Sequence, residues 1–229
     1  VVELMPYSNG LNRNIVQCLH DYDIPLYLSH TVTDIVGDKR LEKVIISKVD
    51  ENKKPIKGSE VEFSCDTLLL SVGLIPENEL SKKVGVSLDN RTNGLVVTEN
   101  METNIDGIFA CGNVVHVHDL VDFVSEEAKR AGKAVAKYLN NSLEKKTYTN
   151  IKNGSGINYT VPQKISVNDI DDKLTIFMRV NNVYKDMIIK VMSGDNIIQS
   201  LKRKHLAPAE MERVVIKKEL LKDLNEDII

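Results

Sequence analysis

Two residues suited to ligand binding, Gly112 and Asn113, follow the short apolar run Ile108–Cys111. Such a run predicts a buried strand, and ligands of open α/β sheets bind where strands end. Glycine has no side chain, so a bound molecule can contact the backbone there. The asparagine amide both donates and accepts hydrogen bonds, as a sugar-like hydroxyl requires. The pair therefore predicts a ligand site, with an ordinary strand that ends in a turn as the alternative.

A second buried strand is predicted over residues 67–72, where the apolar residues do not alternate with polar ones. This strand ends at Gly73, and Pro76 forces the chain to turn away. A small strand over Gly94–Thr98 then precedes the Ile108–Cys111 strand. The order of these segments predicts two strand tips that both serve a ligand, although a strand followed by Gly-x-x-Pro is common by itself.

The two segments together resemble the flavoproteins of the pyridine-nucleotide-disulfide oxidoreductase superfamily, which includes thioredoxin reductases and NADH oxidases. The family's second flavin motif reads Thr, a few residues, an apolar pair, Ala, any residue, Gly and Asp. Here it runs from Thr103 to Asn113, with Asn113 in place of the aspartate. The family's other motif matches Asp66–Asn78, with Glu77 as one additional residue. The resemblance covers about residues 1–140.

The resemblance implies FAD and NAD as cofactors and hydride transfer between NAD(H) and FAD, with an unidentified electron acceptor and an unidentified catalytic residue. It places Gly112 and Asn113 on FAD and Gly73 near the nicotinamide dinucleotide. It also places Val124 and Ser125, at the start of the next helix, beside the flavin ring. The positive end of that helix would stabilise charge on the reduced flavin.

The first residues, Val1–Glu3, are predicted to end a strand with a carboxylate. In dinucleotide-binding folds such a carboxylate, about 20 residues after the glycine-rich turn, binds the ribose of NAD and repels the phosphate of NADP. We therefore assign Glu3 to the NAD ribose, with an ordinary strand-end carboxylate as the alternative. Neither G-x-G-x-x-G turn of the family occurs in the chain. We interpret the chain as a C-terminal part of a longer flavoprotein.

The remaining patterns predict the elements that hold these residues. Helices are expected over 11–19 and 121–138, and Gly132 should let the second helix approach a sheet closely. Strands are expected over 24–28, and over 31–36, 41–49 and 61–65, which form an antiparallel meander. Alternation over 173–180 places Leu174, Ile176, Met178 and Val180 on one face of a strand. More strands are expected over 184–192, 197–202 and 213–217, followed by a short helix over 220–229.

The predicted fold class is α/β, with partial Rossmann-like NAD and FAD domains and a small all-β, sandwich-like domain. The NAD domain combines a parallel sheet with the antiparallel meander and occupies residues 1–75. The FAD domain occupies 76–140, a linker 141–158, and the all-β domain 159–229. The role of the all-β domain is open; docking of a partner is one hypothesis.

His116 and His118 lie two residues apart, so strand geometry would place both on one face. Asp119 and Asp122 follow, but no third and fourth metal ligand is evident, so no metal site is predicted. A loop that lines a flavin or substrate pocket and a plain surface loop remain the two alternatives for this segment.

Composition restricts the class of protein. The 229 residues carry a net charge of -3, which indicates no strong attraction to nucleic acid or to membranes, and no apolar run is long enough to span a bilayer. The three cysteines, Cys18, Cys65 and Cys111, are far apart, which argues against a disulfide framework or a dithiol centre and predicts buried free thiols in a cytoplasmic protein. The expected partner is a second copy or a dehydrogenase subunit. The alternative function is an assembly module that binds no dinucleotide.

Overall fold

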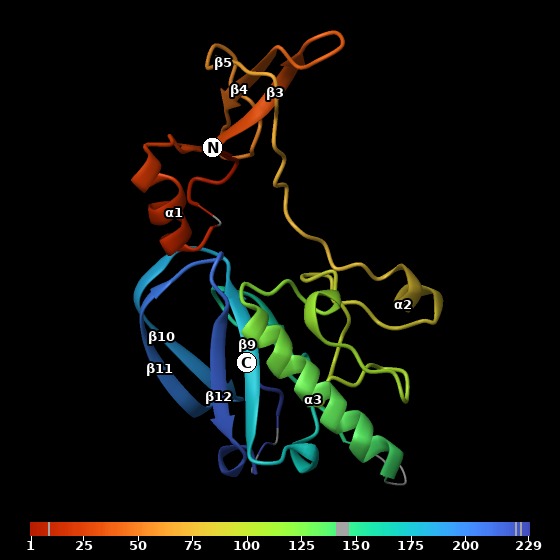
Figure 1. Cartoon of the computed structure of the whole chain (residues 1–229). Helices are drawn as coiled ribbons and strands as arrows, with labels where there is room; N and C mark the ends of the chain where they lie inside the picture. The colour runs from red at the N-terminus through yellow and green to blue at the C-terminus, as the bar shows by residue number, and fades with distance from the viewer. Residues whose placement is uncertain (9, 141–146, 223, 225) are drawn as a thin grey trace. The chain divides into compact units, whose positions relative to one another are not determined.

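The computed structural model describes residues 1–8, 10–140, 147–222, 224 and 226–229 (Figure 1). The contacts divide the chain into two compact units, Val1–Gly73 and Leu74–Ile229. The predicted boundaries at residues 75, 140 and 158 remain predictions, and residues 141–146 of the predicted linker lie outside the described part of the chain.

The first unit begins with a β-α-β arrangement. Strand β1 (Val2–Glu3) pairs in parallel with β2 (Tyr27–Leu28), and helix α1 (Asn12–Cys18) lies between them in sequence, followed by the 3₁₀ turn η1 (His20–Tyr22). The predicted helix is therefore confirmed, while the predicted strand over 24–28 is shorter than expected. Parallel pairing across a helix is the basic unit of a dinucleotide-binding sheet.

The predicted meander follows in the same unit. Strands β3 (His30–Val36), β4 (Lys43–Lys48) and β5 (Val61–Ser64) pair antiparallel in the order β3-β4-β5. Val44 and Ile46 of β4 are buried, so the central strand supplies the apolar face of this sheet. These three strands confirm the predicted antiparallel meander, while the predicted parallel sheet of this part is represented by the pair β1-β2.

The prediction of a buried strand over residues 67–72 is wrong. The segment forms no strand, and Leu69 and Val72 each expose 89% of their surface. A strand buried on both faces needs neighbouring strands to satisfy its backbone and layers to cover its side chains. No described residue pairs with this segment, so its apolar sequence alone does not make it a strand.

The second unit opens with short elements rather than with full strands. Helix α2 (Glu79–Lys83) is followed by loops held together by isolated bridges, among them Leu88 with Leu95 and Glu102 with Phe109. The strand predicted over 94–98 is thus reduced to isolated bridges at Leu95 and at Thr98, which pairs with Lys164, and the strand predicted over 108–111 is reduced to the bridge at Phe109. The chain then turns through the 3₁₀ segment η2 (Gly112–Val114).

Helix α3 (Val121–Asn140) confirms the second predicted helix, but its buried face is not the apolar stripe that the sequence predicts. That stripe is Val121, Val124, Ala128, Ala131, Val135 and Tyr138, and of these only Ala131 is buried. The buried residues are Glu127, Ala131 and Ala134, spaced by one helical turn. Gly132 is exposed, and a Cβ placed on it would meet nothing within 4 Å. Close packing therefore does not explain this glycine.

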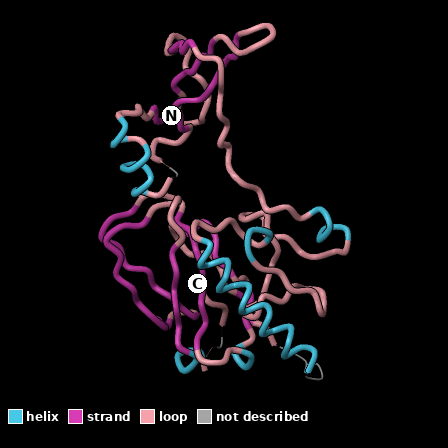
Figure 2. The backbone as a smooth tube through the Cα atoms, viewed as in Figure 1, coloured by secondary structure: helices cyan, strands magenta, loops and turns pink. Residues whose placement is uncertain are grey.

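The C-terminal part, residues 149–229, is rich in strands (Figure 2). A three-stranded antiparallel sheet has the order β12-β9-β7, and a long hairpin pairs β10 with β11, while β6 pairs with β8. The bounds are β6 Thr149–Asn150, β7 Ile157–Val161, β8 Lys164–Ile165, β9 Lys173–Val180, β10 Tyr184–Ser193, β11 Asn196–Leu206 and β12 Glu212–Lys217, with 3₁₀ turns η3 Val167–Asp169 and η4 Lys218–Leu221. Each strand predicted over 173–217 is therefore present.

Strand β9 separates two apolar cores. Its alternate residues Leu174, Ile176, Met178 and Val180 are buried in one core together with residues of the β10-β11 hairpin, as the alternation predicted. Phe177 on the opposite face is fully buried, and α3 lies across that side of β9 and β12 (Figure 1). The sheet is thus covered on both faces, by the hairpin and by α3.

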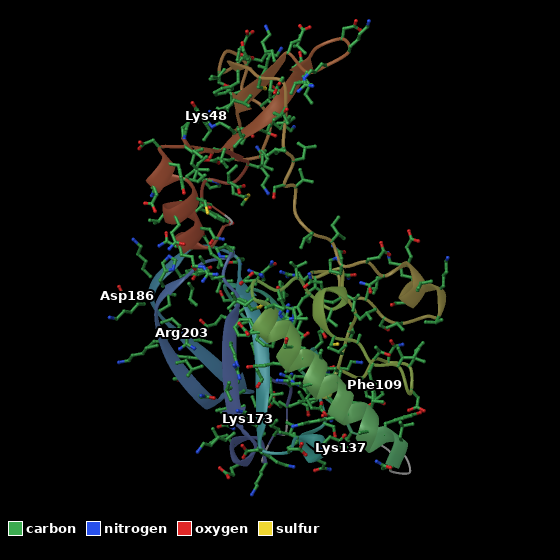
Figure 3. The ribbon with its side chains drawn as sticks, in the orientation of Figure 1. Lys48, Phe109, Lys137, Lys173, Asp186 and Arg203 are labelled. Carbon is green, nitrogen blue, oxygen red and sulfur yellow. The ribbon has the colours of Figure 1, made fainter. Side chains whose placement is uncertain are left out.

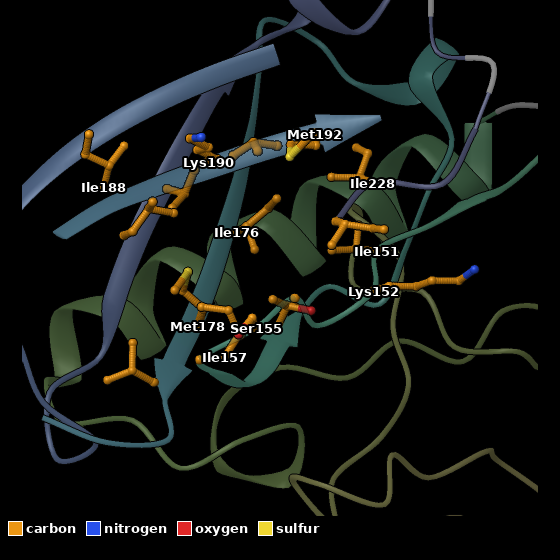
Figure 4. A pocket seen from close by; sticks show the side chains of 18 of the residues that line it. Ile151, Lys152, Ser155, Ile157, Ile176, Met178, Ile188, Lys190, Met192 and Ile228 are labelled. Carbon is orange, nitrogen blue, oxygen red and sulfur yellow. The ribbon is translucent and has the colours of Figure 1, made fainter. Parts of the chain in front are cut away.

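The predicted C-terminal helix over 220–229 is wrong beyond the short 3₁₀ turn η4. Ile228 instead forms bridges with Ile151 and with Ser193, because its backbone is used by two neighbouring strands. This tail closes one end of an apolar cavity of about 340 Å³ between the hairpin and the sheet (Figure 4). Lys190 and Lys152 are among its few charged lining residues, and Lys152 is paired with Asp227 at 2.8 Å.

Candidate flavin site

The turn at Gly112 requires glycine. Its φ of +75° lies in the left-handed region, and an ideal Cβ would sit 3.3 Å from Cγ1 of Val124. Gly112 is buried, so the backbone of the turn lies directly against the first turn of α3. Gly112 and Val124, which are both predicted to bind FAD, are therefore neighbours in space.

Asn113 and Ser125 are exposed beside this contact. The Oδ1 atom of Asn113 accepts a hydrogen bond of 3.2 Å from the backbone N–H of His118, which folds the following loop back onto the turn. Ser125 directly follows Val124 in α3. The turn and the beginning of the helix thus gather four of the six predicted site residues, and their assignment to FAD remains a prediction.

The other two predicted site residues, Glu3 and Gly73, belong to the first unit. Glu3 ends β1 and is half-buried, and its Oε1 accepts a hydrogen bond of 2.9 Å from the N–H of Met5. Gly73 has a φ of +96° in an extended segment, and a Cβ there would meet nothing within 4 Å. Its conformation, rather than a close contact, favours glycine.

A buried cluster that the sequence did not predict lies beneath the turn. The carboxylate of Glu127 accepts hydrogen bonds from the backbone N–H of Gly112 (2.8 Å) and from Nε2 of His116 (2.7 Å). Nε2 of His118 lies 3.0 Å from the same carboxylate, without the geometry of a hydrogen bond. All three side chains are at most 1% exposed.

Burial and mutual contact set the charges of this cluster. Burial alone would raise the pKa of Glu127, but the two imidazoles beside it lower that pKa to about 2. Burial lowers the pKa of His116, and its hydrogen bond to Glu127 only partly opposes this shift. At neutral pH the cluster is therefore a carboxylate that accepts from neutral His116.

The pKa of the Cys111 thiol is raised, chiefly by burial and in addition by the negative charge of Glu127. The raised pKa makes Cys111 a poor nucleophile.

The donor set of His116, His118 and Glu127 also resembles a metal site, since one ligand atom from each lies within 4.8 Å of the others. The third ligand that the sequence did not reveal is thus Glu127. However, metal-binding histidines usually donate their second ring N–H to an acceptor, and Nδ1 of both histidines has no hydrogen-bond partner among the described residues. Direct contact at 2.7 Å between His116 and Glu127 fits a hydrogen-bonded pair better.

Asn78 links the two motifs found in the sequence. This residue is buried, and its Nδ2 donates to the carbonyl oxygens of Asn93 (3.1 Å) and Val114 (3.0 Å). Gly94 lies so close to Val115 that any side chain there would collide with its carbonyl oxygen. The segment after Pro76 is thereby tied to the turn at Gly112.

One signal could have revealed Glu127. It shares the buried stripe of α3 with Ala131 and Ala134, and a carboxylate on such a stripe needs a buried partner.

The expectation of three buried thiols is wrong for Cys18, which is exposed, while Cys65 and Cys111 are half-buried. All three are free, as expected.

Comparison with known proteins shows the family to which the chain belongs. Residues 3–164 match the family model of the pyridine nucleotide-disulphide oxidoreductases, and the chain belongs to this family. The family depends on flavin and on nicotinamide dinucleotides. The relatives whose names state an activity are oxidoreductases. No helix in the described ranges combines the length and the apolar character needed to cross a membrane.

Three relatives define the similarity. A ferredoxin–NADP reductase 2 of Bacillus pumilus is 24% identical over 124 residues, 54% of this chain and 35% of that protein. A 34.2 kDa protein in the rubredoxin operon of Clostridium pasteurianum is 34% identical over 84 residues, 36% of this chain and 24% of that protein. The thioredoxin reductase of T. acidophilum superimposes with a TM-score of 0.52 and 28% identity, over 61% of this chain and 43% of that chain. The chain thus spans between about a quarter and a third of the length of these two curated relatives.

Proposed function

We propose that this protein is a flavin-dependent oxidoreductase that transfers hydride between NAD(H) and FAD, and that Gly112, Asn113, Val124 and Ser125 bind the FAD. The supporting observation is the contact between the left-handed Gly112 and Val124, which brings a bare backbone turn to the beginning of a 20-residue helix. A dinucleotide needs such a close backbone approach at the point where a helix begins.

The residues fit FAD chemically. Asn113 uses Oδ1 for the N–H of His118, and an amide has further hydrogen-bonding capacity for a ribityl hydroxyl. The exposed Ser125 and the half-buried Val124 would face the flavin ring, with the positive end of α3 favouring negative charge there. Bound flavin supplies the hydride chemistry, while the chain supplies binding, orientation and electrostatics.

For the nicotinamide dinucleotide we propose Glu3 and Gly73. One carboxylate oxygen of Glu3 accepts the N–H of Met5, and no described residue bonds the other, which is therefore available for a ribose hydroxyl. A carboxylate at that position repels the additional phosphate of NADP, which favours NAD. Gly73 combines exposure with a left-handed conformation, as a backbone that contacts a ligand would.

The test is flavin content. The protein, purified from its complete reading frame, should show the visible absorption of flavin and gain thermal stability with FAD. Asn113→Leu should reduce the bound flavin, because a ribityl hydroxyl loses its polar partner. Asn182→Leu is the matched control, since Asn182 is also exposed and its Oδ1 also accepts a backbone N–H.

Unchanged flavin stoichiometry in Asn113→Leu would refute the role of Asn113. A colourless protein whose melting temperature responds neither to FAD nor to NADH would refute the whole proposal. That second result would favour the alternative, an assembly module that binds no dinucleotide.

A further inference from the structure

We infer that the strand-rich part of the second unit, residues 149–229, holds the Gly112–Asp119 loop in shape for FAD, with Arg179 as the positioning residue. We call this segment the 112–119 loop. The inference rests on the proposed function only for its flavin measurement.

Arg179 connects β9 to the loop through a branched set of hydrogen bonds. Its guanidinium donates to Oδ1 of Asp119, to the carbonyl oxygens of Val117 (3.1 Å) and Pro208 (3.0 Å), and to the Tyr159 hydroxyl (3.0 Å). The Arg179 and Asp119 side chains are 14% and 13% exposed. A planar guanidinium can serve four acceptors in fixed directions, which a lysine ammonium cannot do.

Asp119 is held from two sides by the strand-rich part. One carboxylate oxygen accepts from Arg179, and the other accepts from the backbone N–H of Met211, just before β12. Both partners lie more than 55 residues from Asp119 in sequence. The C-terminal end of the loop is thus fixed by groups outside the loop itself.

Phe177 supports the middle of the loop. It is fully buried on the same face of β9 as Arg179, and its ring centroid lies 5.8 Å from that of His116 and 5.6 Å from that of His118. The histidine rings are themselves 4.2 Å apart, so the three rings form one packed group. This packing holds His116 where its Nε2 donates to Glu127.

Glu127 then transmits the position to the N-terminal end of the loop. Its second carboxylate oxygen accepts from the N–H of Gly112. Arg179 therefore holds the C-terminal end of the loop. Phe177 holds the N-terminal end through His116 and Glu127. A loop that is already ordered loses less conformational entropy on binding FAD, which increases affinity.

The experiment compares Arg179→Lys with the wild-type full-length protein. We expect the Kd for FAD to rise about tenfold, because several hydrogen bonds to a charged group are lost. Hydrogen exchange of the amides in the 112–119 loop should accelerate in the same variant without FAD. Asp119→Asn should also raise the Kd, and the double variant should be less impaired than the sum of the two single effects, because the two residues share one hydrogen bond.

Two controls separate positioning from general loss of stability. Arg203→Lys alters a comparable pair, since Arg203 on β11 (Figure 3) donates to Glu212 at 2.8 Å and, among the described residues, to none of the 112–119 loop, and it should leave FAD affinity and loop exchange unchanged. Val214→Ala opens the core on the opposite face of the sheet. It should lower the melting temperature, whereas the rate at which amides of the 112–119 loop exchange through local opening should stay at the wild-type value.

Wild-type FAD affinity together with wild-type loop exchange in Arg179→Lys would overturn the inference. If the wild-type protein retains no flavin, the proposed function fails, but the exchange data still decide whether Arg179 orders the loop. Elemental analysis is a second check. A stoichiometric transition metal in the purified protein would overturn the route through His116 and Glu127, because the metal would replace their hydrogen bond.

Discussion

The carboxylate of Glu127 and the backbone N–H of Gly112 form a buried hydrogen bond of 2.8 Å. The two residues come from different elements, the middle of α3 and the beginning of η2. Because Gly112 also requires a left-handed backbone, this bond stabilises a conformation that the local sequence would not hold by itself.

Replacing Glu127 by glutamine should destabilise the protein by about 1–3 kcal/mol, because an amide cannot accept from both Gly112 and His116 and places a donor among donors. Chemical denaturation measures this change. Glu126→Gln is the matched control, since Glu126 is exposed and its contact with Arg213 is 3.3 Å, so we expect less than about 0.5 kcal/mol. Equal effects of the two substitutions would contradict the role of Glu127.

Stability should fall as the pH decreases, in two stages. The pKa of His116 is below its ordinary value of 6.5, so the unfolded chain binds the proton first and stability is lost below about pH 6.5. The pKa of Glu127 is lowered from 4.5 to about 2, so its contribution is present above pH 4.5 and is lost as the pH falls towards 2. Denaturation midpoints from pH 8 to pH 3 test this, and His116→Gln should remove the first stage.

Two glycine substitutions should have opposite signs. Gly112→Ala should cost about 1–2 kcal/mol, because φ is +75° and the new methyl group would lie 3.3 Å from Val124. Gly132→Ala should stabilise by about 0.5–1 kcal/mol, because Gly132 lies within α3 and faces open space. Thermal unfolding of the two variants measures both. A stabilising Gly112→Ala would mean that the turn relaxes to another conformation.

Replacing Glu3 by alanine or arginine should shift the preference from NADH towards NADPH, because the carboxylate that repels the additional phosphate is removed. The ratio of kcat/KM for the two cofactors measures the shift. Glu3→Gln is a useful third variant, since it keeps an acceptor for the N–H of Met5 and loses only the charge. An unaltered ratio in all three variants would remove Glu3 from the nucleotide site.

Periodic patterns predicted the elements whose residues contact near neighbours in sequence. The presence of α1 and α3, the three strands of the meander and the alternation of β9 depend on local geometry, and the structure agrees with them, although the buried face of α3 differs from the predicted one. The run over 67–72 is one prediction that failed. Its burial required neighbouring strands, which no described residue provides, so composition misled the prediction.

The sequence by itself determined the family motifs, the glycine at 112 and the asparagine at 113, because these depend on residue type and spacing along one segment. Only the tertiary structure decided which side chains support that segment. Glu127 is 15 residues from Gly112, and Arg179 is 60 residues from Asp119. Such contacts form when α3 and β9 both pack against the loop, and no periodicity within either element specifies the partner that it meets.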